Sequence, residues 1–246
     1  MDTDDLIASQ IAYYRARAAE YDNWLEDRDE SDISAEFLER WEADDVAARA
    51  WLAADPPRGH VLEIAAGSGS WTGELLRTAD RVTAVDAAPE MLALLSRKHD
   101  GVETITADVF AWEPAQRYDD IFFGFWLTHV PAARWEGFWD LVGRALVPGG
   151  RVFFVDNAHP DFANASGPGD WPEAVGERRS ETAGPETRRR TLRDGSQWTM
   201  VKRFWRPGEL TAELARLGWL ASAAHTSFAF IYGTARRLVA EPAEIP

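Results

Sequence analysis

From His60 onward, short apolar runs alternate with segments whose apolar residues recur at helical spacing, and this alternation is the strongest constraint on the fold. It implies parallel strands joined by right-handed crossovers, with helices on both faces of a doubly wound α/β sheet. Ligands of such sheets bind beside the carboxyl ends of the strands. The predicted strands are 61–66, 81–87, 102–108, 119–126 and 151–158.

The two ends of the chain extend this pattern. Residues 1–55 are rich in acids and aromatics at amphipathic helical spacing, which predicts two or three helices forming an N-terminal lid. Residues 56–246 then form one Rossmann-like domain, with a lid insertion at about 157–195 that begins as a long irregular loop through residue 190. A strand, a helix and a closing strand are predicted at 196–205, 207–218 and 226–238, completing a mostly parallel seven-stranded sheet with an antiparallel edge hairpin.

Composition excludes several classes of function. Acidic residues outnumber basic ones by 41 to 26, and the net charge of -15 creates a field that repels nucleic acid. The chain contains no cysteine, which excludes disulfides and thiolate metal sites. It has neither an apolar run long enough to cross a membrane nor a secretory signal at its start. We therefore expect a cytoplasmic protein that binds neither nucleic acid nor membrane.

The most informative segment is VLEIAAGSGSWT, residues 61–72. It runs from a buried strand through a Gly-x-Gly turn into a helix, a geometry that lets a nucleotide-type cofactor approach the backbone closely. A dinucleotide fingerprint requires Gly-x-Gly-x-x-Gly, whereas the third glycine here, Gly73, comes one residue late. The carboxylate of Glu63 would repel a pyrophosphate and attract an ammonium group. We therefore expect a cofactor with a cationic portion near the turn.

Carboxylates also end the next two predicted strands. Asp86 is placed to accept hydrogen bonds from both hydroxyls of a ribose. Asp108, followed by Val109, is placed to accept a hydrogen bond from the exocyclic amino group of a purine. Each acid alone is equally well explained as a solvated strand end. Three acids at the ends of three successive strands indicate a single site.

In this order the motifs resemble those of the class I S-adenosylmethionine-dependent methyltransferase family. The matching runs are VLEIAAGSGSWT, AVDAAPEML, TADVF, YDDIFFGFWLTHV and ALVPGGRVFFVD, within residues 60–156. The N-terminal YYRARAAEYDNW is similar to the lid helix of small-molecule members. The resemblance implies S-adenosylmethionine as cofactor and methyl transfer to an oxygen or nitrogen of a small-molecule metabolite, with carbon less favoured. Ala65 and Ala66 replace the Gly-Cys or Gly-Ala often found in the family, and alanine is small enough to keep the close approach.

The resemblance also implies which residues contact the cofactor. They are Glu63, Ala65 and Gly67 around the methionine part, Asp86 at the ribose, Ala87 and Met91 at the adenine face, Asp108 and Val109 at the adenine edge, Phe125 beside the sulfonium, and Tyr14 and Tyr21 from the lid. For the two tyrosines, packing of a helix face on the sheet is the alternative interpretation.

A histidine is the best candidate for acid-base chemistry. His129 directly follows the fourth predicted strand, and its imidazole would accept a proton from a hydroxyl or ammonium nucleophile. The alternative is a purely structural histidine. His159, at the mouth of the insertion, is the second candidate and is expected to contact substrate. Asp156 and Asn157 resemble part of the magnesium site of catechol-type methyltransferases, but no acid ends the fourth strand, so no metal is predicted.

A basic cluster interrupts the acidic balance of the chain. Its interpretations are a solvated face that pairs with the acidic N-terminal helices, a site for an anionic substrate group, or a homodimer contact. The cluster comprises Arg178, Arg179, Arg188, Arg189, Arg190, Arg193, Lys202, Arg203 and Arg206.

For the whole chain, the alternatives to a methyltransferase are an NAD(P)-dependent oxidoreductase, a serine hydrolase and a non-catalytic adenosyl-binding protein.

Overall fold

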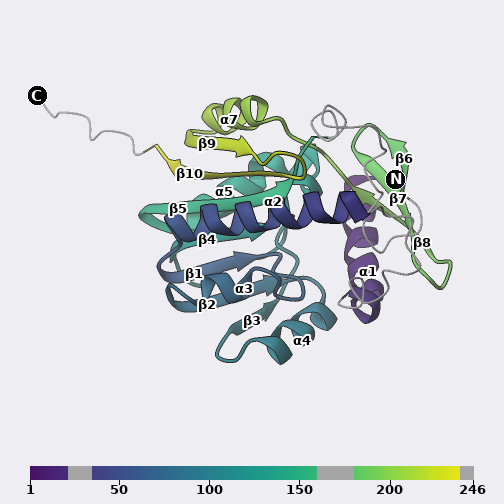
Figure 1. Ribbon diagram of the computed structural model, residues 1–246, viewed down its shortest axis with the longest axis horizontal. Coiled ribbons are helices and arrows are strands. Elements are labelled where there is room, and N and C mark those ends of the chain that lie inside the picture. The colour runs from purple at the N-terminus through teal and green to yellow at the C-terminus, as the bar shows by residue number, and fades with distance from the viewer. Residues whose placement is uncertain (22–34, 160–179, 239–246) are drawn as a thin grey trace, which may run out of the picture.

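The centre of the computed structural model is a seven-stranded sheet with the order β3-β2-β1-β4-β5-β10-β9 (Figure 1). The structure describes residues 1–21, 35–159 and 180–238. The five strands β1 to β5 run parallel to one another, whereas β10 is antiparallel to both of its neighbours. The predicted α/β fold class is therefore confirmed. The strands are β1 (Gly59–Ile64), β2 (Ala79–Asp86), β3 (Glu103–Thr106), β4 (Tyr118–Gly124), β5 (Leu146–Asn157), β9 (Trp219–His225) and β10 (Phe230–Arg237).

Helices cover both faces of this sheet, because successive side chains of its central strands point to opposite sides. On β4, Ile121 and Phe123 face one apolar cluster and Phe122 faces the other. One face carries α2 (Ala35–Ala54), α3 (Thr72–Leu75) and α4 (Pro89–Lys98). The opposite face carries α5 (Trp135–Ala145) and α7 (Pro207–Arg216), and two short 3-10 helices, η3 (Leu127–His129) and η4 (Ala132–Arg134), precede α5.

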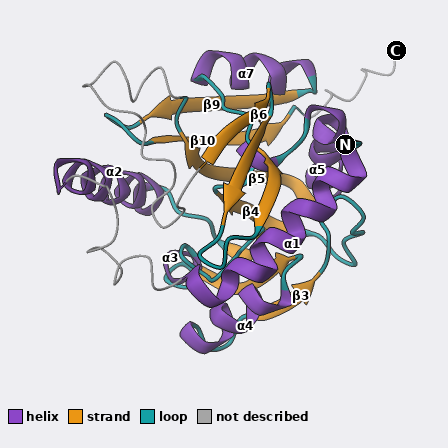
Figure 2. Ribbon diagram, turned by 90° about the vertical axis from the view of Figure 1, so that its right-hand side faces the viewer, coloured by secondary structure: helices purple, strands orange, loops and turns teal. Residues whose placement is uncertain are grey.

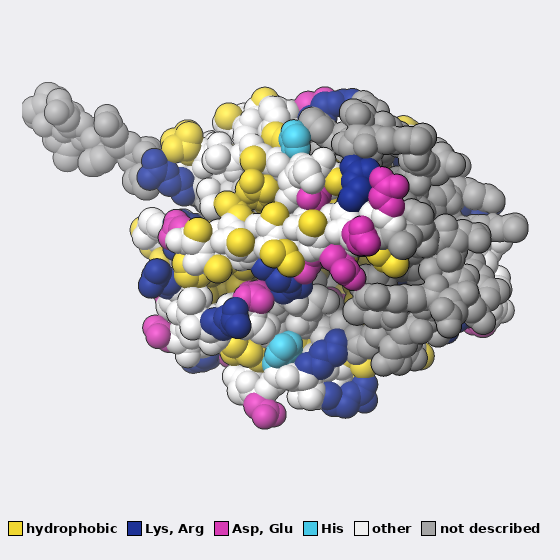
Figure 3. Space-filling view, in the orientation of Figure 1, with side chains coloured by type: hydrophobic (Ala, Val, Ile, Leu, Met, Phe, Trp, Pro, Cys, Tyr) yellow, Lys and Arg dark blue, Asp and Glu magenta, His cyan; other side chains and the backbone are white. Residues whose placement is uncertain are grey.

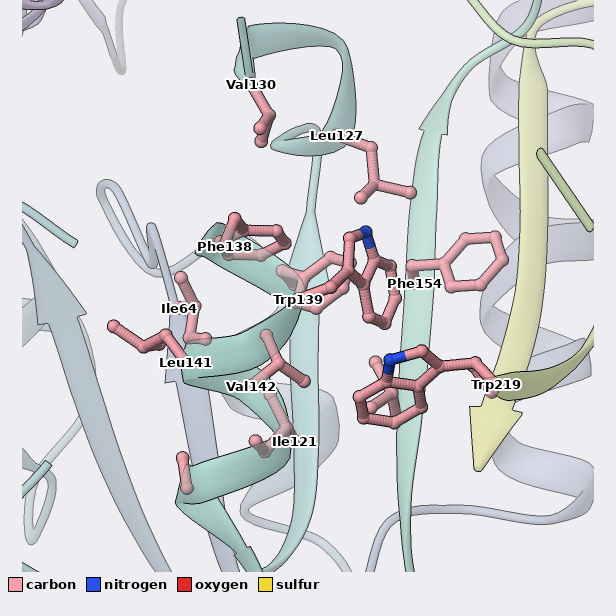
Figure 4. Close-up of a cluster of buried hydrophobic side chains, with 14 of the residues drawn as sticks. Ile64, Ile121, Leu127, Val130, Phe138, Trp139, Leu141, Val142, Phe154 and Trp219 are labelled. Atoms are coloured by element: carbon pink, nitrogen blue, oxygen red, sulfur yellow. The ribbon is translucent and has the colours of Figure 1, made fainter. Parts of the chain in front are cut away.

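Aromatic residues of α5 form the larger core cluster. Trp139 points from α5 between β4, β5 and β9, where its ring lies 5.0 Å from that of Trp219 (Figure 4). Phe138 packs on Phe123 at 5.6 Å. Edge-to-face pairs of this kind add about 1 kcal/mol each to the hydrophobic gain from burial. The core thus fixes α5, and with it the segment between β4 and α5 that carries His129.

A second, three-stranded antiparallel sheet lies beside α1 (Thr3–Tyr21), at the end of the main sheet (Figure 2). Tyr13 of α1 packs in one cluster with Leu192 and Met200. The main chain of Arg203, just after this sheet, donates a hydrogen bond to the carbonyl of Thr128, at 2.8 Å. The sheet and α1 therefore cover the carboxyl end of β4. Its strands are β6 (Ser180–Gly184), β7 (Thr187–Thr191) and β8 (Gln197–Val201).

Two predictions about the C-terminal part were wrong. Residues 180–190, predicted as irregular loop, form β6 and most of β7, polar strands whose side chains carry no hydrophobic period. The predicted strand at 196–205 is β8, which pairs with β7 instead of joining the main sheet. Its place in the main sheet is taken by β9, an alanine-rich edge strand that the sequence pattern did not reveal. Residues 160–179 of the predicted insertion lie outside the described residues.

The N-terminal segment divides into two differently placed helices, with residues 22–34 outside the described part. Helix α1 packs against β8 and α4, whereas α2 lies along the face of the sheet near β10 (Figure 1). Figure 3 shows hydrophobic side chains on the outer surface of α2. Val46 of this helix is exposed. Apolar residues thus occupy both faces of α2. Burial alone does not determine how this helix is oriented.

Asp44 provides the missing constraint on α2. Its buried carboxylate accepts hydrogen bonds from the hydroxyl groups of Thr226 (2.5 Å) and Ser227 (2.8 Å). It also accepts bonds from the backbone N–H groups of Phe228 (2.8 Å) and Ala229 (2.5 Å). Burial opposes ionisation, but these bonds outweigh it and lower the pKa of Asp44. One side chain therefore joins α2 to the β9–β10 turn.

We expect Asp44→Ala to lower the free energy of unfolding by about 3 kcal/mol, because it leaves buried donors without an acceptor. Asp45→Ala is the matched control and removes only a surface pair with Arg49, worth under about 1 kcal/mol. The pKa of Asp44 is lowered on folding. The difference in free energy of unfolding between wild type and Asp44→Ala should therefore shrink as pH falls below about 4. Urea unfolding at several pH values measures it, and equal costs for the two variants would contradict the assignment.

Candidate active site

A single cavity lies between α1 and the carboxyl ends of β1, β2 and β4. All the predicted cofactor residues and His129 line it, although they come from five separate segments of the chain. These residues are Tyr14, Tyr21, Glu63, Ala65, Gly67, Asp86, Ala87, Met91, Asp108, Val109, Phe125 and His129. The lining also includes Ile7, Gln10, Ile11, Ser68, Ser70, Trp71, Phe110 and Trp126, which the sequence analysis did not single out.

The turn after β1 brings backbone to the cavity surface. Ala65 and Gly67 have positive φ angles of 53° and 55°. For Ala65 this conformation costs about 1 to 2 kcal/mol, a strain typical of ligand-binding turns. The space beside Gly67 is open, since a Cβ placed there would meet nothing within 4 Å. His99 shares a 2.9 Å hydrogen bond with the carbonyl of Gly69 and so holds the turn from α4, a contact the sequence analysis missed.

Glu63 is a buried carboxyl group of this cavity with a strongly raised pKa. Its side chain is 2% exposed and accepts a 2.6 Å hydrogen bond from the hydroxyl of Thr72. Burial raises the pKa of Glu63 to about 8; the bond from Thr72 acts against this rise and the charge of Asp86 adds to it. The carboxyl is therefore mostly protonated at neutral pH. A cationic ligand beside it would favour the ionised form.

The other two acids are held by backbone groups while still facing the cavity. Asp86 accepts hydrogen bonds from the N–H groups of Gly67 (2.9 Å) and Ala88 (2.8 Å). Burial raises the pKa of Asp86 in spite of these bonds. Asp108 accepts a bond from the N–H of Phe110 at 3.0 Å. Carboxylate oxygens at the ends of adjacent strands suit the hydroxyl and amino donors of an adenosyl group.

A histidine-tyrosine pair lies at the end of β4. The Nε2 atom of His129 and the Oη atom of Tyr14 are 3.1 Å apart and share a hydrogen bond. Burial, followed by the charges of Lys202 and Arg190, lowers the pKa of His129 well below its usual value. Burial also raises the pKa of Tyr14. Both groups are therefore neutral at neutral pH, and the imidazole is in the form that can accept a proton.

Gln10 attaches α1 to this pair. Its side-chain amide donates a 3.3 Å hydrogen bond to the carbonyl of His129 and accepts a 3.2 Å bond from the N–H of Val201. Gln10 is 3% exposed, so these bonds are shielded from water. The sequence offered only one signal for this role, a polar residue on the buried face of an amphipathic helix.

Phe125 and His159 occupy different environments. Phe125 lines the cavity with a φ of 55°, and its N–H donates a 2.7 Å hydrogen bond to the carbonyl of Val155. Its ring packs on Phe230 at 5.4 Å. His159 does not line the cavity; its ring lies 6.3 Å from that of Phe204, which follows β8. Its predicted contact with substrate stays a prediction.

Within the described ranges, no helix combines the length and apolar character needed to cross a bilayer.

Comparison with known proteins agrees with this fold and cavity. Residues 61–150 match the sequence profile of a family described as "Methyltransferase domain". DhpI, in a complex with S-adenosylhomocysteine, is 38% identical with a TM-score of 0.76, and the match covers 96% of this chain and 98% of DhpI. A S-adenosylmethionine-dependent methyltransferase from Clostridium acetobutylicum shares the fold, with a TM-score of 0.59 and 15% identity over 91% of this chain and 98% of that one.

Curated sequences give a shorter match. Demethylmenaquinone methyltransferase from Tropheryma whipplei is 31% identical over 103 residues, which is 41% of this chain. The match spans 42% of that relative's length.

A Rossmann-like sheet with an acidic cavity at its carboxyl edge defines a class of nucleoside-cofactor enzymes. With the comparisons, the assignment becomes specific: the chain belongs to the class I S-adenosylmethionine-dependent methyltransferases. It is an enzyme, and its cofactor is S-adenosylmethionine.

The raised pKa of Glu63 predicts a pH-dependent stability. Because the folded state binds a proton that the unfolded state releases, the free energy of unfolding should fall as pH rises from about 4.5 to about 8. Glu63→Gln should remove this slope and be more stable than wild type at pH 8. Unfolding in urea at pH 5, 6.5 and 8 measures the slope, and a wild-type profile unaffected by the substitution would contradict the prediction.

Proposed function

We propose that this methyltransferase transfers the methyl group of S-adenosylmethionine to an oxygen or nitrogen atom of a small-molecule metabolite, with His129 as general base. The single observation that carries the proposal is the hydrogen bond between the buried His129 and the partly buried Tyr14 in the cavity lining. An acceptor that loses a proton on methylation needs a neutral base close to the reacting atoms. A neutral imidazole meets that requirement.

The cofactor supplies an electrophilic methyl group, so the protein chiefly has to bind, orient and exclude water. In the proposed site, Glu63, Asp86 and Asp108 hold the cofactor through their carboxylates. Helix α1 closes the cavity through Gln10 and Tyr14. His129 accepts the proton of the acceptor hydroxyl or ammonium group. Tyr14 fixes the orientation of the imidazole.

The relatives support a small acceptor next to the cofactor. DhpI, which matches nearly the whole chain, is also described as a complex with SAM and HEP. Helix α1 lines one side of the cavity, opposite the strand ends, and such a recess favours a metabolite over a macromolecule as substrate. His159 is proposed as a substrate contact at the rim of this region. The location of the enzyme in the cytoplasm and its formation of a homodimer stay predictions.

We expect Asp86→Ala to weaken the binding of S-adenosylhomocysteine by about 2 kcal/mol, or about thirtyfold in Kd, because charged hydrogen bonds to ribose hydroxyls would be lost. Asp100→Ala, an exposed acid after α4, is the matched control and should bind like wild type. Isothermal titration calorimetry provides both values. Unchanged affinity in Asp86→Ala would remove this residue from the proposed cofactor site.

We expect His129→Asn to lower kcat by about a hundredfold or more, with little change in cofactor affinity or Tm, because the proton acceptor is lost. Tyr14→Phe keeps the aromatic ring at position 14 and leaves His129 in place, so the decrease in kcat should be smaller in this variant. Since the pKa of His129 is well below its usual value, the low-pH limb of the wild-type rate profile should lie well below pH 6.5 and disappear in His129→Asn.

The assay follows formation of S-adenosylhomocysteine with a panel of small hydroxyl, carboxylate, phosphate and amine acceptors. Near-normal turnover of His129→Asn with the best acceptor would leave alignment of the reactants as the mechanism. Binding of the cofactor without turnover of any acceptor would favour a non-catalytic adenosyl-binding protein.

A further inference from the structure

A buried lysine lies beside His129 with part of its hydrogen-bonding capacity unused. Lys202 is 7% exposed, and its Nζ atom donates to the hydroxyl of Thr128 at 3.0 Å and to the side-chain carbonyl of Asn157 at 2.6 Å. An ammonium group has three donors. Within the residues that the structure describes, two of the three have acceptors, and both acceptors are neutral.

The acid next to Lys202 is already engaged. Both carboxylate oxygens of Asp156 accept hydrogen bonds from Thr128, and one of them also accepts the N–H of Asn157 at 2.7 Å. In the described part of the chain, no carboxylate lies within 4.0 Å of Nζ of Lys202. The charge of Lys202 is thus solvated by amide and hydroxyl oxygens, with Asp156 as a more distant counter-charge.

Further cations surround this position. Burial lowers the pKa of Lys202 to about 7; Asp156 opposes the change, while Arg190, Arg188 and Arg17 add to it. Arg190 and Arg17 also lower the pKa of His129. Lys202 further lies 5.5 Å from the ring centre of Phe204. In a chain with a net charge of -15, this is a local region of positive potential at the carboxyl edge of the sheet.

We propose that Lys202, together with Asn157, forms a subsite for an anionic group of the methyl acceptor, either a carboxylate or a phosphate-type group. The inference rests on the proposed function, in which the acceptor meets His129. Thr128 and His129 are consecutive residues of η3, so an anion at Lys202 would lie next to the proposed base. Lys202 is absent from the lining of the cofactor cavity, which separates this subsite from the acids that face the cofactor.

An anion would improve the electrostatics of the subsite. Bound to Lys202, it supplies the missing third acceptor and offsets the repulsion among the four cations. It should therefore raise the pKa of Lys202. The groups that face Lys202 and enter this balance are Asp156, His129, Arg17, Arg188 and Arg190. A lysine that only cross-links η3, β5 and β8 would show no such response.

The composition of the chain makes this response measurable, because Lys98 and Lys202 are its only lysines. Protein labelled with ¹⁵N at lysine Nζ should give one signal for each of them. With S-adenosylhomocysteine present, we expect inorganic phosphate or acetate to shift the signal of Lys202 saturably. The anion should also raise the pKa of Lys202 by at least about one unit, which corresponds to a tenfold preference for the charged form.

The two anions distinguish the two sources of the charge. A response to phosphate alone supports a phosphate-type acceptor, and a response to acetate alone supports a carboxylate. A response to both supports recognition of the charge itself. The absence of a saturable response to either anion overturns the proposal.

Variants test the same subsite by calorimetry with the responding anion. Lys202→Met should weaken anion binding at least tenfold and leave the affinity for S-adenosylhomocysteine within about twofold, whereas Lys202→Arg should retain most of the anion affinity. Arg236 is an exposed cation on β10 that pairs with Arg151, in the middle of β5. Arg236→Met is therefore the matched control and should bind the anion normally. Equal anion affinities in Lys202→Met and wild type would overturn the subsite.

Failure of this inference can be told from failure of the proposed function. If His129 is not the base, His129→Asn keeps its turnover while the anion still shifts the signal of Lys202. If the subsite is wrong, His129→Asn loses turnover and the lysine signal does not move. Should Lys202→Met fold poorly, the titration of the wild-type lysine still decides the question.

Discussion

Burial of ionisable groups at the carboxyl edge of the main sheet is the interaction on which the rest of this site depends. Glu63 and His129 carry strongly shifted pKa values because water is removed from them, not because each has a strong ionic partner. Helix α1 lines this cavity, and Gln10 ties it to η3 and β8. The packing of α1 therefore contributes to the shifted protonation equilibria of the cavity.

The main sheet could be predicted from the sequence because its strands are buried on both faces and read as apolar runs, as in Phe122 and Phe123 of β4. The C-terminal strands carried weaker information. Strand β9 lies at the sheet edge, and its alternation of Ala and Ser resembles a turn or helix as much as a strand. Strand β7 is built from threonine and arginine, and it is recognisable only from its pairing with β6 and β8. Tertiary contacts, not local propensity, define these elements.

The candidate site was predictable to the extent that strand ends locate it. Glu63, Asp86 and Asp108 each lie at or near the end of a predicted strand, so their convergence follows from the parallel sheet alone. Lys202 gave no such signal, because it lies in a basic stretch that the sequence alone explains equally well as a solvated face. Its role depends on burial and on Thr128 and Asn157, which come from segments distant in the sequence. Only the folded chain brings these three groups together.

Placing a cation beside a neutral imidazole has a consequence for catalysis. Burial and, after it, the positive charge of Lys202 lower the pKa of His129, which keeps the imidazole unprotonated but also makes it a weak base. An anionic acceptor bound at Lys202 would cancel part of that field just as the acceptor reaches the base. The pKa of His129 would then rise in the complex. An arrangement of this kind keeps the base neutral in the free enzyme and strengthens it only when a substrate of the correct charge is present.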